Sequence, residues 1–413
     1  MTMSVSDKKQ RGLILLCWLV YASAYLGRYS YHANINLIMA EYAVNHASAG
    51  LVTTFFFFAY GVGQIVNGIL CKYYNKKRVL GGALLVSALL NLAVFFGADF
   101  QSMKYLWLAN GLVQSVLWPS LVLVLGQNLE EDHLKRAVLV ISTTTAAGTL
   151  ISYGLSALLA LSGNYRYSFL AGGIALAAVA AVWMLSYSKL TANTSREKAS
   201  PAAPADLPSP RPAKGIYPVI VFLALFAVIN NLIKDGLSTW VPSILMENYG
   251  LSNSISVSLT LVLPILGIFG TTAAVALNRR IKDFISLSSA FFALSAITIL
   301  SVIFLLGTEL WMVVLVCFGL VTLLMSGINN VITSMSPLYL RNELNPGALS
   351  GILNGFCYAG STISSYGLGA IADSAGWNGV FSLFLWLSIG ASAAGGCYAW
   401  FQRKKGRRLS GRQ

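Results

Sequence analysis

The sequence predicts an all-α membrane protein with twelve transmembrane helices in two pseudo-symmetric bundles of six. Of its 413 residues, 56% are hydrophobic and only 10% are charged, and the mean hydropathy of +0.69 lies outside the range of soluble domains. Apolar stretches long enough to cross the hydrocarbon layer recur along the whole chain. The predicted spans are 12–40, 49–71, 79–99, 104–127, 137–161, 166–187, 216–246, 254–278, 285–305, 310–338, 348–372 and 378–401.

The positive charges predict how the chain is oriented. With the N-terminus assigned to the cytoplasm, 24 of the 28 Lys and Arg residues fall in cytoplasmic segments, two on the opposite side and two inside spans. This distribution follows the positive-inside rule. We therefore expect a multi-pass protein of the cell membrane (the inner membrane in a bacterium) with both termini in the cytoplasm, and no nucleic-acid partner. The first apolar stretch is too long for a cleavable signal peptide.

One segment interrupts the hydrophobic pattern. Residues 189–215 are rich in Pro, Ala and Ser with scattered charges, which is typical of a flexible cytoplasmic linker. This linker separates an N-terminal six-helix bundle, 1–188, from a C-terminal bundle with a basic cytoplasmic tail, 216–413.

The two halves contain similar sequences. AAGTLISYGL (146–155) aligns with YAGSTISSYGL (358–368), which places Gly148 opposite Gly360, 212 residues later. Tyr165 and Trp377 are also 212 residues apart. Duplicated bundles with a substrate site at the interface of the repeats are a recurring transporter architecture.

Two cations lie inside predicted spans. Arg28 is in the first span and Lys234 in the seventh, so each is in the first span of its half. A charge near the bilayer centre costs about 2.5–3.5 kcal/mol on insertion scales and usually faces a water-filled cavity. We expect the two cations to meet across such a cavity and to bind one anion.

Polar side chains form stripes at helical spacing in spans 1, 2, 5, 7, 10 and 11, so these helices are predicted to surround the cavity. Spans 3, 6, 9 and 12 carry little beyond scattered hydroxyls and Asn91, and they are predicted to face lipid and brace the bundle. A single Asn, Ser or Thr more often joins two helices through a hydrogen bond worth about 0.6 kcal/mol. The stripes contribute the binding-site candidates Tyr21, Tyr25, Arg28, Tyr60, Gln64, Lys234, Asn330, Asn354 and Tyr358.

Two further polar residues are candidates for coupling, with alternatives left open. Asp235 follows Lys234 directly; it either pairs with a neighbouring helix, the interpretation we favour, or carries a proton. His32 lies one turn after Arg28 and either forms a helix–helix hydrogen bond, again the favoured interpretation, or relays protons.

Several segments carry a family resemblance: YASAYLGRYSYHANINLIM, YGVGQIVNGIL, NGLVQSVLWPS, KDGLSTWVPSIL and GFCYAGSTISSYGLGAIADSAGWNGVF. In this order and spacing they resemble the organophosphate:phosphate antiporter family of the major facilitator superfamily, to which glycerol-3-phosphate and hexose-phosphate transporters belong. The resemblance extends over all twelve spans and implies the major facilitator fold.

The resemblance implies roles for individual residues. Arg28 takes the position of the phosphate-binding arginine of span 1, and Lys234 that of the span-7 cation. The family's binding-site tyrosines correspond to Tyr21, Tyr25, Tyr60 and Tyr358.

The chain also departs from the family pattern. Thr145 stands where glycerol-phosphate carriers have a span-5 histidine, and Gln64 replaces their span-2 lysine. Lys72 replaces the aspartate of the superfamily's loop pattern after span 2, and Asp235 is unusual directly after the span-7 cation.

These observations together predict a secondary active transporter of a small phosphorylated or other anionic metabolite, working by alternating access in exchange for inorganic phosphate. The alternatives are a proton-coupled organic anion symporter and a transport-inactive membrane sensor of phosphosugars. No nucleophile stands beside a base and the five cysteines form no metal pattern, so we expect no enzyme, no catalytic residues, no metal and no cofactor. We expect a monomer in contact with membrane lipid.

Overall fold

The computed structural model describes residues 5–191, 216–281, 283–340, 344 and 346–410. These residues are almost entirely helical, and no strand occurs among them. The chain divides into two compact units. Unit 1 comprises Met1–Val44, Leu51–Leu207 and Ser252–Leu261, and unit 2 comprises Asn45–Gly50, Pro208–Leu251 and Val262–Gln413.

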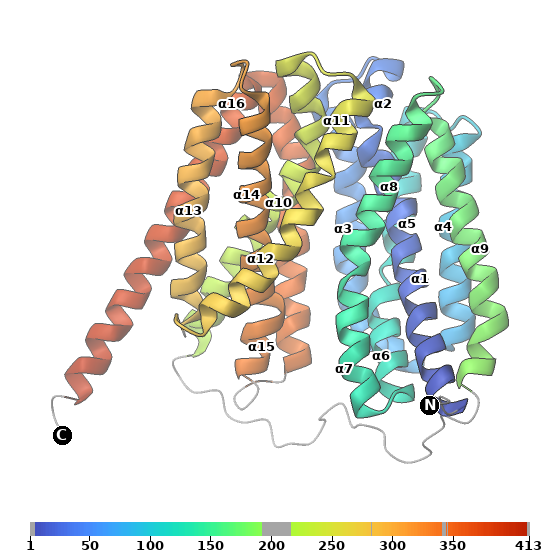
Figure 1. Cartoon of the computed structure of the whole chain (residues 1–413), viewed down its shortest axis with the longest axis horizontal. Helices are drawn as coiled ribbons and strands as arrows, with labels where there is room; N and C mark the ends of the chain where they lie inside the picture. The colour runs from blue at the N-terminus through green and yellow to red at the C-terminus, as the bar shows by residue number, and fades with distance from the viewer. Residues whose placement is uncertain (1–4, 192–215, 282, 341–343, 345, 411–413) are drawn as a thin grey trace. The chain divides into compact units, whose positions relative to one another are not determined.

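The helices of unit 1 and their bounds are as follows (Figure 1). They are α1 (Val5–Ala33), α2 (Ile35–Tyr42), α3 (His46–Leu70) without its first five residues, the 3₁₀ turn η1 (Cys71–Tyr73), α4 (Lys76–Phe95), α5 (Phe100–Gln114), α6 (Leu117–Asn128), α7 (Glu131–Ser142), α8 (Thr144–Ala160), α9 (Arg166–Thr191) and α11 (Asn253–Thr260). Residues 189–191 of the predicted linker belong to α9, and the rest of that linker lies outside the described residues.

Unit 2 contains the remaining helices. They are α10 (Ile216–Tyr249), α12 (Val262–Asn278), α13 (Phe284–Leu305), α14 (Trp311–Asn330), the π-helical turn η2 (Val331–Met335), α15 (Ser336–Tyr339) and α16 (Pro346–Ser410). The neighbours α12 and α14 lie side by side, and α16 packs against both α10 and α13 (Figure 1).

The predicted spans are accounted for by these helices. Ten apolar helical stretches in the described part of the chain are long enough to cross a membrane. One of them, Leu349–Gln402, covers two predicted spans, and Gly376 with φ 66° marks the kink inside it. A positive φ of this size is readily adopted only by glycine. The shorter apolar helix Thr144–Ala160 supplies most of the fifth span, so the all-α, twelve-span prediction is confirmed.

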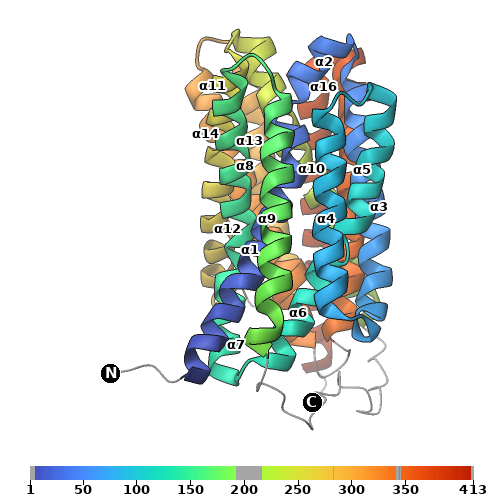
Figure 2. The ribbon, with the colours of Figure 1, turned by 90° about the vertical axis from the view of Figure 1, so that its right-hand side faces the viewer.

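The core of unit 1 is built around its first helix. α1 packs against α8 and α9, and α9 in turn packs against α4, an arrangement that can be followed in Figure 2. Trp183 of α9 and Leu84 of α4 are fully buried in the same cluster as Val20 of α1. This packing holds α1, whose C-terminal part carries Arg28, inside unit 1.

The matched glycines of the two repeats occupy corresponding places in their units. A Cβ atom on Gly148 of α8 would lie 2.7 Å from Tyr25 Cβ of α1, and one on Gly360 of α16 would lie 2.2 Å from the Val228 carbonyl oxygen of α10. Each glycine therefore lets its helix approach the first helix of the same half, a few residues before the cation. Close approach at small residues is typical of helix packing in membranes.

We expect Gly360→Ala to lower the free energy of unfolding by about 1–3 kcal/mol, because the methyl group overlaps the α10 backbone. Unfolding of the purified protein by heat or by a denaturing detergent measures this loss. Gly351→Ala in the same helix is the matched control, because no atom lies within 4 Å of the position that its Cβ atom would take. Equal stability of the two variants would contradict the assigned close approach.

Candidate functional site

Arg28 of α1 is buried in unit 1, with only 3% of its surface exposed. Its guanidinium carbon lies 4.4 Å from the ring centre of Tyr60 and 5.0 Å from those of Tyr25 and Phe56. Aromatic faces attract a cation by up to about 2 kcal/mol each when water is excluded. These rings offset part of the cost of placing the charge inside a span, and they do not neutralise it.

A neutral amide provides the hydrogen-bond acceptor for the guanidinium. Arg28 donates from Nε and Nη2 to Gln114 Oε1 of α5, at 3.4 and 3.3 Å. Gln114 in turn donates to Ser87 Oγ at 2.9 Å and to Asn110 Oδ1 at 3.2 Å. The Gln114 side chain is thereby fixed with its oxygen toward Arg28.

The same network returns to the backbone of α1. Asn91 and Asn110 each donate to the carbonyl oxygen of Gly27 at 3.1 Å, and Ser30 donates to Asn91 Oδ1 at 3.3 Å. Ser87, Asn91, Asn110 and Gln114 are all fully buried. A fully satisfied buried network of this kind specifies one arrangement of its helices.

This network shows contacts through which α4, the predicted span 3, braces the bundle. Ser87 and Asn91 of α4 point into unit 1 and position the residue before Arg28. None of Ser87, Asn91, Asn110 and Gln114 was among the predicted site residues. The available signal was the i, i+4 spacing of Ser87 with Asn91 and of Asn110 with Gln114, which places each pair on one helix face.

The predicted tyrosines of unit 1 are brought together with Gln64. Tyr21 Oη lies 3.4 Å from Tyr60 Oη, and Gln64 donates to Tyr60 Oη at 3.0 Å. Tyr25 Oη is bonded to Thr145 Oγ1 of α8 at 2.9 Å. The residue that replaces the family's span-5 histidine is therefore linked to the ring that lies against Arg28.

His32 is placed differently from the favoured expectation. It is 1% exposed, and within the described residues neither of its ring nitrogens has a hydrogen-bond partner. Its ring contacts Tyr29 and Phe57, at 5.0 and 6.0 Å between ring centres. The helix–helix hydrogen bond predicted for His32 is therefore wrong, and the proton-relay alternative stays a prediction.

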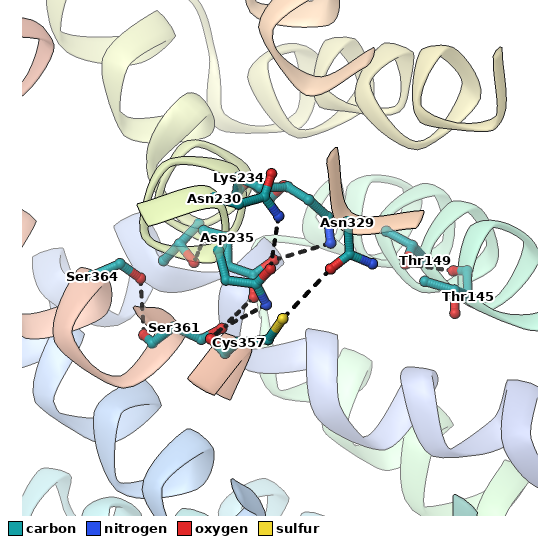
Figure 3. A network of polar contacts seen from close by, with 12 residues as sticks. Thr145, Thr149, Asn230, Lys234, Asp235, Asn329, Cys357, Ser361 and Ser364 are labelled. Atoms are coloured by element: carbon teal, nitrogen blue, oxygen red, sulfur yellow. Dashed lines mark hydrogen bonds and ion pairs between the residues drawn. The ribbon is translucent and has the colours of Figure 1, made fainter. Parts of the chain in front are cut away.

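In unit 2, Lys234 and Asp235 of α10 form the centre of a second polar group (Figure 3). Lys234 Nζ lies 3.6 Å from Asp235 Oδ1, and both side chains are partly exposed, at 26% and 18%. Ser361 of α16 donates to Asp235 Oδ2 at 2.5 Å. Asp235 therefore contacts both Lys234 and a neighbouring helix, and its role as a proton carrier stays a prediction.

Amide side chains extend this group. Asn231 of α10 donates to Ser361 Oγ at 3.4 Å and accepts from Asn230 at 3.0 Å. On the other side, Cys357 Sγ lies 3.7 Å from Asn329 Oδ1 of α14 (Figure 3). Asn329 was not predicted to contribute. It precedes the π-helical turn η2, a feature that often occurs at functional sites.

The other predicted residues of unit 2 lie on the same helices. Asn330 ends α14, and Asn354 and Tyr358 lie on α16 within one turn of Cys357. All three are half-buried. Their roles in substrate binding stay predictions.

The two polar groups are similar in the local arrangement of their residues. Tyr25 stands three residues before Arg28 and bonds Thr145 of α8, while Asn231 stands three residues before Lys234 and bonds Ser361 of α16. In each unit, the partner helix is the one that carries the matched glycine. The two groups differ in the partner of the cation, because Lys234 lies beside the Asp235 carboxylate whereas Arg28 donates to the Gln114 amide.

We expect Gln114→Leu to lower the free energy of unfolding by about 1.5–3 kcal/mol, because the guanidinium of Arg28 loses its fixed acceptor. Thermal unfolding of the purified protein measures the change. Gln101→Leu is the control, because Gln101 is exposed at the start of the same helix. Among the hydrogen bonds described, its side chain takes part in one, which it accepts from Lys104. If Gln114→Leu were as stable as Gln101→Leu, Gln114 would not be holding Arg28 in place.

The chain is similar in sequence to several known membrane proteins. Sugar phosphate exchanger 3 of Gallus gallus is 23% identical over 386 residues, covering 81% of this chain and 76% of that protein. Membrane sensor protein UhpC of Escherichia coli (strain K12) is 30% identical over 105 residues, which are 25% of this chain and only 24% of the sensor. The hexuronate transporter of Bacillus subtilis (strain 168) is 23% identical over 274 residues, covering 65% of this chain and 64% of that protein. The expected resemblance is confirmed by these relatives.

Solved structures confirm the fold. A bacterial homolog of the human lysosomal transporter Spinster has a TM-score of 0.73 at 12% identity, covering 94% of this chain and 96% of that one. The family model described as Major Facilitator Superfamily matches residues 17–345. The chain is thus a multi-pass membrane protein that belongs to the major facilitator superfamily.

Proposed function

We propose that this protein is a secondary transporter that exchanges a small phosphorylated metabolite for inorganic phosphate by alternating access. The observation that carries the proposal is the setting of Arg28. Its guanidinium is buried in a membrane span, where it donates to the amide oxygen of Gln114 and lies against the Tyr60 ring. A charge inside a membrane span costs free energy, and binding an anion is the function that explains why the charge is there.

The two cations suit different parts of phosphate binding. A phosphate monoester carries about −1.5 to −2 charges near neutral pH and several acceptor oxygens. Arg28 offers a planar fork for bidentate contact with phosphate, whereas Lys234 offers a mobile point charge. We assign phosphate binding to Arg28 and Lys234 acting together during the transport cycle.

Asp235 gives Lys234 a partner in the absence of substrate. The pair is partly exposed, so its strength is about 0–1 kcal/mol. An arriving phosphate group can therefore replace Asp235 as the partner of Lys234. Asp235 keeps its hydrogen bond from Ser361 when this happens, so no buried group loses all its contacts.

Exchange follows from this charge balance. Neither Arg28 nor Lys234 has to change protonation, so one anion leaving can be replaced by another arriving. The Sugar phosphate exchanger 3 relatives support exchange of this type. We further propose that the protein lies in the cell membrane with both termini in the cytoplasm, on the distribution of Lys and Arg. That it is a monomer stays a prediction.

Two alternatives have specific support. Asp235 and the similarity to the hexuronate transporter favour a proton-coupled organic anion symporter. The match to the sensor UhpC favours a protein that binds phosphosugars and does not move them. Binding without flux in proteoliposomes is the result that would establish the sensor.

We expect Arg28→Ala and Lys234→Ala each to reduce homoexchange of labelled phosphate by about 100-fold or more, because each removes a cation that contacts the anion. The measurement uses proteoliposomes loaded with unlabelled phosphate. Lys104→Ala is the control, because Lys104 bonds the exposed Gln101 at the start of α5. Exchange at the wild-type rate in both variants would refute the proposal.

We expect Asp235→Asn to retain phosphate homoexchange within about fivefold, because Asn still accepts from Ser361 and leaves Lys234 free for the anion. The same variant tests the symport alternative. If an imposed pH gradient drives uptake by the wild type without counter-phosphate, and Asp235→Asn abolishes this uptake, the protein is a proton-coupled symporter and not an exchanger.

A further inference from the structure

A second group of ionisable side chains lies in unit 2, separate from the Lys234 group. His46, the first residue of α3, places Nδ1 2.7 Å from Asp373 Oδ1 of α16. Its Nε2 lies 2.7 Å from Glu247 Oε1 of α10. One imidazole therefore contacts two carboxylates at once. The position of each partner is fixed by further contacts.

Asp373 also binds the backbone at the start of α3. Its two oxygens accept from the amides of His46 and Ala47, at 3.1 and 2.8 Å. A carboxylate at this end of a helix satisfies free N–H groups and complements the helix dipole. Asp373 is therefore held in place independently of the imidazole.

Glu247 and the imidazole are fixed by tryptophans. Trp377 donates from Nε1 to Glu247 Oε2 at 2.8 Å. The His46 ring lies edge-on to Trp240 and Trp377, with ring centres 5.4 and 5.3 Å apart. These rings confine the imidazole to the position between the two carboxylates.

The backbones also come close at this point. A Cβ on Gly50 would lie 2.1 Å from the Ser365 carbonyl oxygen, and one on Gly369 would lie 2.6 Å from the His46 carbonyl oxygen. The first turn of α3 is thus packed directly onto α16. Residues 45–50 belong to unit 2, whereas the rest of α3 belongs to unit 1.

The number of protons follows from the hydrogen bonds. A neutral imidazole has one N–H and one acceptor nitrogen, so it cannot donate to two ionised carboxylates. Both contacts become donor–acceptor pairs when the ring is an imidazolium. Since histidine ordinarily binds protons more strongly than Asp or Glu does, the ring is the group that carries the proton.

We propose that His46, Glu247 and Asp373 form a proton-binding site whose occupied state keeps the first turn of α3 on α10 and α16. The facing ionisable groups are Glu247 from α10 and Asp373 from α16. Separation of this turn leaves His46 as an ordinary histidine, so the packed state holds the proton at higher pH than the separated state does.

The direction of the pH effect follows from linkage. The packed state binds more protons, so acidification stabilises it and rising pH weakens it. Proton binding here therefore alters the free energy of any rearrangement that moves the first turn of α3 away from α10 and α16. This site is distinct from the proposed exchange of anions, which needs no titration.

The test measures the protonation of His46 directly. The chain contains three histidines, so selective ¹⁵N labelling of histidine yields few side-chain NMR signals, and His46→Gln assigns the one of interest. We expect both ring nitrogens of His46 to be protonated at pH 7.5, where an ordinary histidine is about 90% neutral. Asp373→Asn should shift this signal toward the neutral form. A neutral His46 ring in the wild type at pH 7.5 would overturn the proposal.

A second measurement follows the packing of α3. Ala49 is fully buried, so Ala49→Cys in a Cys397→Ser background reports separation of the first turn by its rate of thiol labelling. Rates are divided by those of the same variant denatured in detergent, which removes the intrinsic pH dependence of the thiol.

We expect the normalised rate to rise about tenfold between pH 6 and pH 8.5, which is one factor of ten per 1.4 kcal/mol. With His46→Gln added, the rate should be high at both pH values, and with His133→Gln added it should match the parent. A normalised rate independent of pH in the parent would contradict the proposed control of packing. Phosphate homoexchange in Arg28→Ala tests the anion site separately, so either proposal can fail alone.

Discussion

The structure depends most on the burial of one guanidinium inside a membrane span. Arg28 cannot be left without partners in an apolar medium, and amide and aromatic side chains of unit 1 are among the groups that meet this need. Gln114 accepts its hydrogen bonds, and the rings of Tyr25, Phe56 and Tyr60 surround its charge. The bonds that orient Gln114 also connect α1, α4 and α5, so the same network positions the cation and fixes the helices of unit 1.

The second unit uses a related plan with a different outcome. Lys234, like Arg28, follows by three residues a polar side chain that bonds the helix carrying the matched glycine. Asp235 gives Lys234 a weak, partly exposed ion pair in place of a buried amide network. We infer that Arg28 is a fixed element of the anion site and that Lys234 is the cation whose partner changes during exchange.

The sequence predicted part of this site and missed the rest. Arg28 and Lys234 stand out because a charge in an apolar span is rare. Gln114 does not, since an amide in such a span can face either lipid or the protein. For His32 the favoured hydrogen bond was wrong, because its ring lies between Tyr29 and Phe57. Asn329 was not predicted, because regular helical spacing along span 10 selected its neighbour Asn330 instead.

The sequence by itself determined the helical class, the number of spans and the family, because these depend on local apolar length and on residue order. Only the tertiary structure decided which polar groups meet. His46 contacts Glu247 and Asp373, which lie 201 and 327 residues later in the chain. Such contacts depend on the rotation and register of each helix against its neighbours. Hydropathy constrains neither, because any rotation leaves the apolar length of a span unchanged.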